Sequence, residues 1–120
     1  MKALLKGLFL CVTMHTSAQH IDPLLVLGKT TPPLVGNMQE EVYKAYEQMR
    51  KAAAKTGIDI KAVSAHRSYH RQREIWNAKY STLISQGLSA KDAIQEIITY
   101  STLPGTTRHH WGTDIDIIDN

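Results

Sequence analysis

Cysteine is almost missing from this chain of 120 residues, in which Cys11 is the only one. Cys11 falls in an N-terminal stretch with the features of a cleaved leader, so the mature protein can carry no disulfide. Long apolar runs are missing too, since a membrane-spanning helix needs about 20 apolar residues and none occurs here. Internal repeats, low-complexity tracts and linkers are also lacking. The length therefore predicts one small domain with a modest core.

A strong charge of one sign is lacking as well. The formal net charge is +3, and it falls to +1 without Lys2 and Lys6 of the leader. A nearly neutral domain gives little reason to expect nucleic acid or an anionic membrane as the main partner. We therefore expect neither.

Residues 1–18 have the pattern of a secretory signal. Lys2 and Lys6 give a positive start, residues 8–12 form a short apolar centre, and Thr16-Ser17-Ala18 precede a cleavage site. The alternative is a buried N-terminal helix. The signal predicts a protein exported to the periplasm or cell envelope, with no stable membrane span after cleavage.

The rest of the chain shows alternating helix and strand patterns. Residues 19–36 are rich in proline and glycine and predict an irregular segment that contains at most one helical turn. Residues 37–120 form the expected domain. Apolar spacing predicts an α+β fold, in which helices pack on a small, mainly antiparallel sheet. The expected helices span residues 37–57, starting at an Asn37 N-cap, 69–85 and 89–100, and the expected strands span 58–63 and 113–118.

The residues with the clearest chemistry lie between Leu103 and Asp119. A Pro-Gly turn precedes His109 and His110, and a strand follows in which aspartates alternate with apolar residues. Imidazole and carboxylate are ordinary zinc ligands, and a catalytic zinc takes three protein ligands with one open position. The strand period places Asp114 and Asp116 on one face, so either carboxylate is a possible ligand. The other face carries the apolar residues and is expected to be buried.

The run from Thr107 to Asp116 resembles the S-x-H-x-x-G-x-x-x-D signature of the VanY and VanX type D-alanyl-D-alanine carboxypeptidases and dipeptidases, which are zinc peptidases. The resemblance implies that His109 and Asp116 are zinc ligands. Thr107 keeps the hydroxyl of the family's serine. The family's third ligand and its glutamate base belong to a later E-x-x-H segment that does not occur in these 120 residues. We therefore expect either a fragment of a longer peptidase or a shortened homologue.

A second stretch, residues 64–72, resembles the family's S-x-x-R-S-x-x-x-Q segment. The resemblance implies that Arg67 stabilises the oxyanion of amide hydrolysis. It also makes Gln72 and Ser68 substrate-side or supporting hydrogen-bonding groups. On the residues alone, this stretch could be a solvated helix face, the more common case for a charged helix, or a phosphate-binding patch. His66 or His70 is a further, weaker choice for the third ligand.

The resemblance implies zinc-dependent hydrolysis of peptidoglycan stem peptides, most simply a D-Ala-D-Ala carboxypeptidase. His110 and Trp111 would then form pocket wall, with Trp111 and Thr107 near the substrate, and the protein is expected to be a monomer. Three alternatives stay open: an L-Ala-D-Glu type wall endopeptidase, a non-catalytic zinc or wall-binding homologue, and a small nucleic-acid binder.

Overall fold

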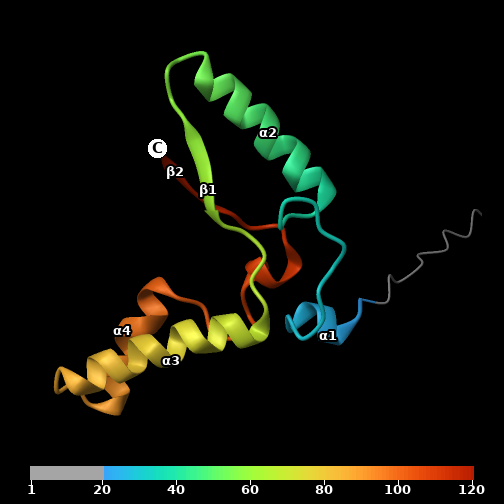
Figure 1. The fold of residues 1–120 in the computed structure, drawn as a ribbon. Helices are drawn as coiled ribbons and strands as arrows, with labels where there is room; N and C mark the ends of the chain where they lie inside the picture. Colours follow the sequence, from blue (N-terminus) through green and yellow to red (C-terminus); the bar gives the residue numbers. More distant parts are fainter. Residues whose placement is uncertain (1–20) are drawn as a thin grey trace, which may run out of the picture.

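The computed structural model describes residues 21–120, and the expected signal at residues 1–18 lies outside this range. Within it, no helix is both long and apolar enough to cross a membrane. Helices α3 and α4 form a hairpin on one side of the molecule, and α2 lies beside the two strands on the other (Figure 1). The elements are α1 (Pro23–Val26), α2 (Glu40–Ala54), β1 (Ile60–Ser64), α3 (Tyr69–Ser85), α4 (Ala90–Tyr100), the 3-10 helix η1 (Arg108–Trp111) and β2 (Asp116–Asp119).

The two strands confirm the expected α+β class. β1 and β2 pair antiparallel, with Ile60 opposite Asp119 and Ser64 opposite Asp116. The register shifts between Ala62 and Ser64, which is the mark of a β-bulge. A bulge bends its strand and re-aims the neighbouring side chains. Here it occurs next to Ser64 and Asp116, where the strand pair meets the loop that carries Arg67.

Helix α2 begins later than its sequence pattern predicts. Asn37 is not the N-cap: its φ is +62°, and Gln39 takes the N-cap position without a side-chain cap bond. The helix is joined to the sheet through Tyr46, whose hydroxyl accepts a hydrogen bond from the Ala62 N–H at 3.0 Å. This contact ties β1 to α2.

The hairpin of α3 and α4 confirms the expected helix of residues 69–85, and the expected helix of residues 89–100 begins at Ala90 with Ser89 as its N-cap. The Ser89 hydroxyl accepts from the Asp92 N–H at 3.2 Å. Ala93 and Ile97 are buried, at 0% and 2% exposure, whereas Ile94, Ile98 and Tyr100 of the same helix are not. Those three side chains are exposed, because α4 packs on the described residues through one narrow stripe.

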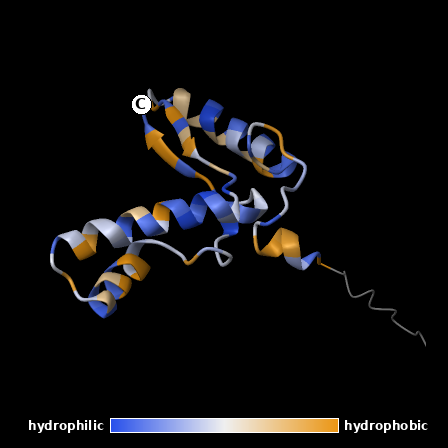
Figure 2. Ribbon diagram, turned by 60° about the horizontal axis from the view of Figure 1, so that its bottom comes forward, coloured by the Kyte–Doolittle hydropathy of each residue, from blue (hydrophilic) through white to orange (hydrophobic). Residues whose placement is uncertain are grey.

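Burial in this molecule is divided between apolar and polar residues. Figure 2 shows hydrophobic residues on α1 and on both strands, and hydrophilic residues along the first turns of α3. The expected burial of the apolar side of the second strand is wrong for Ile117, which is 43% exposed, because the described sheet has only two strands. Among residues 21–120 the buried polar residues are Gln72, Thr107, His109 and His110, which we call the polar hub.

Candidate metal and substrate site

The 3-10 helix η1 sets the direction of both histidines. Thr107 is its N-cap and accepts a hydrogen bond from the His109 N–H at 3.3 Å, while Gly112 ends it with a φ of +70°. The strand pattern predicted from residue 113 begins only at Asp116. This tight turn buries His109 and His110 together, which a strand would place on opposite faces.

His110 holds the site together from behind and does not line it. Its Nδ1 donates to the Arg67 carbonyl at 2.6 Å, and its Nε2 accepts from the Gly105 N–H at 2.9 Å. Because a carbonyl only accepts and an amide N–H only donates, these partners fix a neutral ring with the proton on Nδ1. The ring is fully buried beneath Gly28, where an added Cβ would lie 2.4 Å from it. His110 is therefore not pocket wall.

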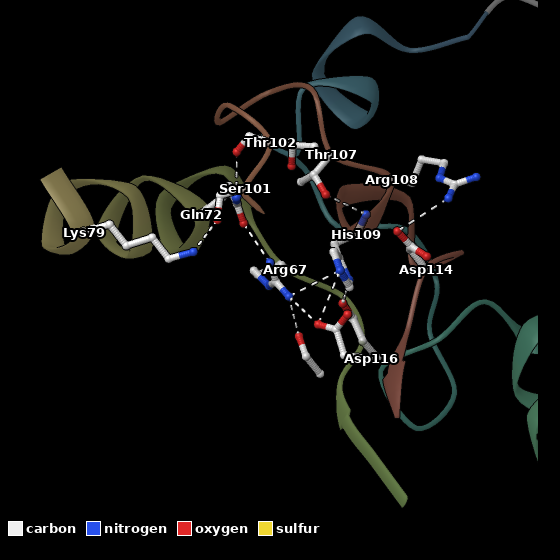
Figure 3. Close-up of polar contacts among 12 residues, drawn as sticks. Arg67, Gln72, Lys79, Ser101, Thr102, Thr107, Arg108, His109, Asp114 and Asp116 are labelled. Carbon is white, nitrogen blue, oxygen red and sulfur yellow. Dashed lines mark hydrogen bonds and ion pairs between the residues drawn. The ribbon is translucent and has the colours of Figure 1, made fainter. Parts of the chain in front are cut away.

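His109 presents its other nitrogen to the candidate site. Its Nδ1 donates to the Ala65 carbonyl at 2.8 Å, so in the neutral imidazole Nε2 is the nitrogen that can accept or bind a metal. Nε2 lies 3.6 Å from an Asp116 carboxylate oxygen and 3.3 Å from Nη2 of Arg67 (Figure 3). A backbone carbonyl behind the imidazole is the usual arrangement for a metal-ligating histidine, because it fixes the tautomer and the ring orientation.

Asp116, and not Asp114, meets His109. Asp116 begins β2 opposite Ser64, and 54% of its side chain is exposed. The Asp114 carboxylate instead lies 3.8 Å from Nη2 of Arg108, on the outer side of the loop (Figure 3). The two aspartates separate because Asp114 precedes the strand, so the strand period does not apply to it.

Arg67 is clamped on several sides. Its Nη1 donates to Gln72 Oε1 at 2.9 Å, and its Nη2 donates to Ser64 Oγ at 2.8 Å and to Asp116 Oδ2 at 2.9 Å. Gln72, only 1% exposed, also donates to the Thr102 carbonyl at 2.8 Å. The residues alone assigned no role to Ser64, although it opens the S-x-x-R segment, and gave no sign of Thr102.

Three further residues that the resemblance placed near substrate lie elsewhere. Ser68 caps α3 by accepting from the Arg71 N–H at 3.2 Å, and it lines a neighbouring cavity. Thr107 is buried and caps η1. Trp111 donates from Nε1 to the Val26 carbonyl at 3.1 Å and lines a separate apolar cavity. The structure does not bring any of the three into the cavity of Arg67, His109 and Asp116.

Neither His66 nor His70 joins the site as a third ligand. Within residues 21–120, no three His, Cys, Asp or Glu side chains lie close enough together to hold a metal. The Nε2 of His66 is buried and has no partner among these residues. Burial, and then the nearby His110, lower the pKa of His66 below its usual value. His70 contacts Arg73 at 3.4 Å on the outside of α3.

A cavity of about 380 Å³ extends from the Arg67, His109 and Asp116 cluster along α3 to the end of α4. Its lining is mainly polar, and Asp116 is the only carboxylate among the lining residues that the structure describes. The other lining residues are Gln72, Ile75, Lys79, Tyr100, Ser101 and Thr102.

The donor set fits a zinc ion in part. One imidazole whose Nε2 can bind a metal when the ring is neutral and one carboxylate are of the right chemistry and lie together, and the Ala65 carbonyl supports the imidazole. A catalytic zinc takes three protein ligands, so this pair is two thirds of such a set.

Comparisons with known proteins identify a matching family and a matching fold. The family model of VanY, D-alanyl-D-alanine carboxypeptidase, matches residues 36–120. A Haemophilus influenzae protein described as uncharacterized is 33% identical over 69 residues, which cover 50% of this chain and 47% of that protein.

Two solved structures also match. A mutant of the vancomycin resistance D,D-pentapeptidase VanY with Zn(II) has a TM-score of 0.64 at 23% identity, over 69% of this chain and 47% of that one. VanYB with D-alanine-D-alanine has a TM-score of 0.68 at 22% identity, over 76% and 52% of the two chains. These structures share the fold, and this chain spans about half the length of the relatives that it matches. With a family model that covers residues 36–120, the chain belongs to the VanY D-alanyl-D-alanine carboxypeptidase family.

Proposed function

We propose that this protein is a zinc-dependent peptidase that releases the terminal D-alanine from peptidoglycan stem peptides. Family membership supports the reaction class. The observation that carries the proposal is the Arg67 guanidinium, which Ser64 and Gln72 hold so that Nη2 faces both His109 and Asp116. A guanidinium held beside two candidate ligand side chains can stabilise the oxyanion that forms when an amide is hydrolysed.

His109 Nε2 and the Asp116 carboxylate would supply two of the protein ligands of the zinc. A zinc ion bound by them supplies Lewis acidity, which polarises a carbonyl oxygen and makes water more acidic. The third ligand is not provided by residues 21–120 in the arrangement described. We propose that it comes from the family's E-x-x-H segment.

Arg67 would act on the substrate directly. Negative charge develops on the carbonyl oxygen when the amide is attacked, and a guanidinium donor held in place stabilises that charge without reorganising. Gln72 and Ser64 would position the guanidinium through their hydrogen bonds to it. Asp116 is the only carboxylate lining the described part of the cavity, so the general base is assigned to the same E-x-x-H segment.

The proposed substrate and the N-terminal sequence suggest where the protein acts. We propose an exported protein of the periplasm or cell envelope, because its substrate would be wall peptide and its first 18 residues have a signal pattern. We further propose that it acts as a monomer and does not bind nucleic acid.

The test is D-alanine release from N-acetyl-L-Lys-D-Ala-D-Ala by the protein encoded by the complete gene, stripped with a chelator and then reloaded with zinc. We expect zinc to restore release, and Arg67→Ala to lower kcat by about 10²–10³-fold, as loss of an oxyanion donor does. Arg67→Lys keeps the charge but loses the paired contacts with Ser64 and Gln72, and it should recover only part of the rate. No release from the zinc-loaded protein, or an unchanged kcat in Arg67→Ala, would contradict the proposal.

Cleavage of an L-Ala-D-Glu peptide by the same zinc-loaded protein, without release of D-alanine, would establish the endopeptidase in its place.

A further inference from the structure

We propose that Lys79, supported by Ser101, binds a carboxylate group of the substrate at the end of the cavity away from His109 and Asp116. This inference rests on the proposed peptidase function and names the substrate group that sets its specificity. It is carried by the placement of Lys79, by its contacts, and by the difference between the two cations of the cavity.

Lys79 lies on the same face of α3 as the clamp of Arg67. Gln72, Ile75 and Lys79 are three and four residues apart, and all of them line the cavity. Side chains at this spacing share one helix face. Seven residues of α-helix advance by about 10 Å. The flexible side chain of Lys79 can span part of that distance, so its ammonium can lie about one peptide residue from the Gln72 end of the cavity.

The two cations of the cavity differ in their partners. Arg67 is engaged by Asp116, Ser64 and Gln72. Among residues 21–120, Lys79 forms no ion pair with any carboxylate, and its ammonium donates to the Ser101 hydroxyl (Figure 3). An ammonium has three donors, so two remain for a ligand. Lys79 is thus the cation of this cavity that is suited to a carboxylate of the substrate, whereas the role proposed for Arg67 is with the oxyanion of the reacting amide.

Ser101 is held where it meets Lys79. It ends α4 in an extended conformation, with φ −143° and ψ 131°, and its N–H donates to the Ile97 carbonyl at 2.8 Å. The next residue, Thr102, is fixed through its carbonyl by Gln72 at 2.8 Å. Gln72 therefore connects the Arg67 end of the cavity with the segment that carries Ser101. Ile75 lies between them and offers an apolar contact for a small side chain such as that of alanine.

Two wall peptides would present a carboxylate to this lysine. In a D-Ala-D-Ala peptide it is the terminal carboxylate of the residue that is released. In an L-Ala-D-Glu peptide it is the free α-carboxylate of the glutamate. Both sources share the chemistry that Lys79 would recognise, and the two are separated by supplying each peptide with its carboxylate free or amidated.

The experiment compares the wild type, Lys79→Met and Lys79→Arg on N-acetyl-L-Lys-D-Ala-D-Ala and its C-terminal amide. L-Ala-D-Glu amidated at its γ-carboxyl group, and the same peptide amidated at the α-carboxyl group as well, form the second pair. We expect Lys79→Met to raise KM for the free acid by about 10–100-fold, the range for a hydrogen bond to a charged group, with kcat little changed. KM for the amide should not move, and Lys79→Arg should restore most of the preference for the acid. Lys91→Met, which removes an exposed lysine from α4, is the matched control and should leave both constants unchanged.

Binding provides a readout that does not depend on turnover. The affinity of N-acetyl-D-Ala-D-Ala, measured by calorimetry, should fall by a similar factor in Lys79→Met and stay constant in Lys91→Met. A wild type that binds this peptide but cleaves neither pair would refute the proposed reaction while the binding data still decide the role of Lys79. Equal KM changes for acid and amide, or an affinity that Lys79→Met leaves unaltered, would overturn the inference.

Discussion

The polar hub and the strand pair are built in opposite ways. The hub residues Gln72, Thr107, His109 and His110 are all less than 8% exposed, whereas Val63, Ile117 and Ile118 on the strands are 43–55% exposed. Buried polar groups are unfavourable unless their hydrogen bonds are made, and in the hub they are made with backbone groups and with Arg67. Hydrogen bonding, more than apolar burial, therefore fixes the geometry of the candidate site.

The largest expected effect on stability comes from displacing His110 from the polar hub. Gly28→Ala places a Cβ 2.4 Å from the imidazole at a φ of +70°, so it combines a clash with a left-handed backbone. We expect a loss of about 4 kcal/mol in the free energy of unfolding, measured by urea denaturation, from overpacking and from the positive φ.

Gly57→Ala is its matched control, because φ is +81° there and an added Cβ meets nothing within 4 Å. It should cost only the backbone part, about 1–2 kcal/mol. Equal losses in the two variants would show that the His110 contact contributes nothing.

The second prediction removes hydrogen bonds from the hub without changing its volume much. Gln72→Leu leaves a donor of Arg67 and the Thr102 carbonyl without their partner, and we expect a loss of about 3 kcal/mol from two unsatisfied groups. Gln48→Leu on the exposed side of α2 should change stability by less than about 0.5 kcal/mol. If packing alone held the hub, Gln72→Leu would be no more destabilising than Gln48→Leu.

A third pair of variants measures how much apolar burial on α4 contributes to the free energy of unfolding. Ile97 is 2% exposed and Ile98, the next residue of α4, is 46% exposed. We expect Ile97→Ala to cost about 2–3 kcal/mol, as truncation of a buried isoleucine does, and Ile98→Ala to cost less than about 1 kcal/mol. If thermal unfolding gave both variants the same stability, another surface would have to cover Ile98 in solution.

The smallest expected effect is on pH dependence. Burial lowers the pKa of His66 in the folded protein, so the unfolded chain takes up the proton first as the pH falls. The contribution of His66 is fully present above its unfolded pKa of about 6.5 and is lost as the pH falls toward the lower folded pKa. Urea denaturation of His66→Phe, followed from pH 8 to pH 5, should show a shallower decline than the wild type. An identical slope would mean that His66 does not titrate in this way.

Local patterns predicted the helices well and the site only in outline. The bounds of α3 and the Ser89 cap follow from residues that are close in sequence. The proximity of Arg67, His109 and Asp116 followed from the family's motifs. The β-bulge at Ser64 could not be predicted, because register depends on pairing between strands about 50 residues apart.

The side-chain directions of His110 and Trp111 could not be predicted from the sequence either. Both lie in η1, a 3-10 turn of four residues, and the side-chain directions there depend on the Thr107 cap and the left-handed Gly112. A helical or strand period says nothing about so short a turn. The apolar alternation of β2 predicted burial, but burial also needs a neighbouring layer, which the strand's own sequence does not specify.

The most direct test of the zinc site uses the two aspartates that the strand pattern did not separate. Zinc affinity of the protein from the complete gene would be measured by competition with a chelator in the wild type, Asp116→Asn and Asp114→Asn. We expect Asp116→Asn to weaken binding by at least tenfold, because it removes the charge of a ligand beside His109, and Asp114→Asn to bind as the wild type does. Equal affinity in Asp116→Asn and the wild type, or a loss in Asp114→Asn instead, would contradict the site described here.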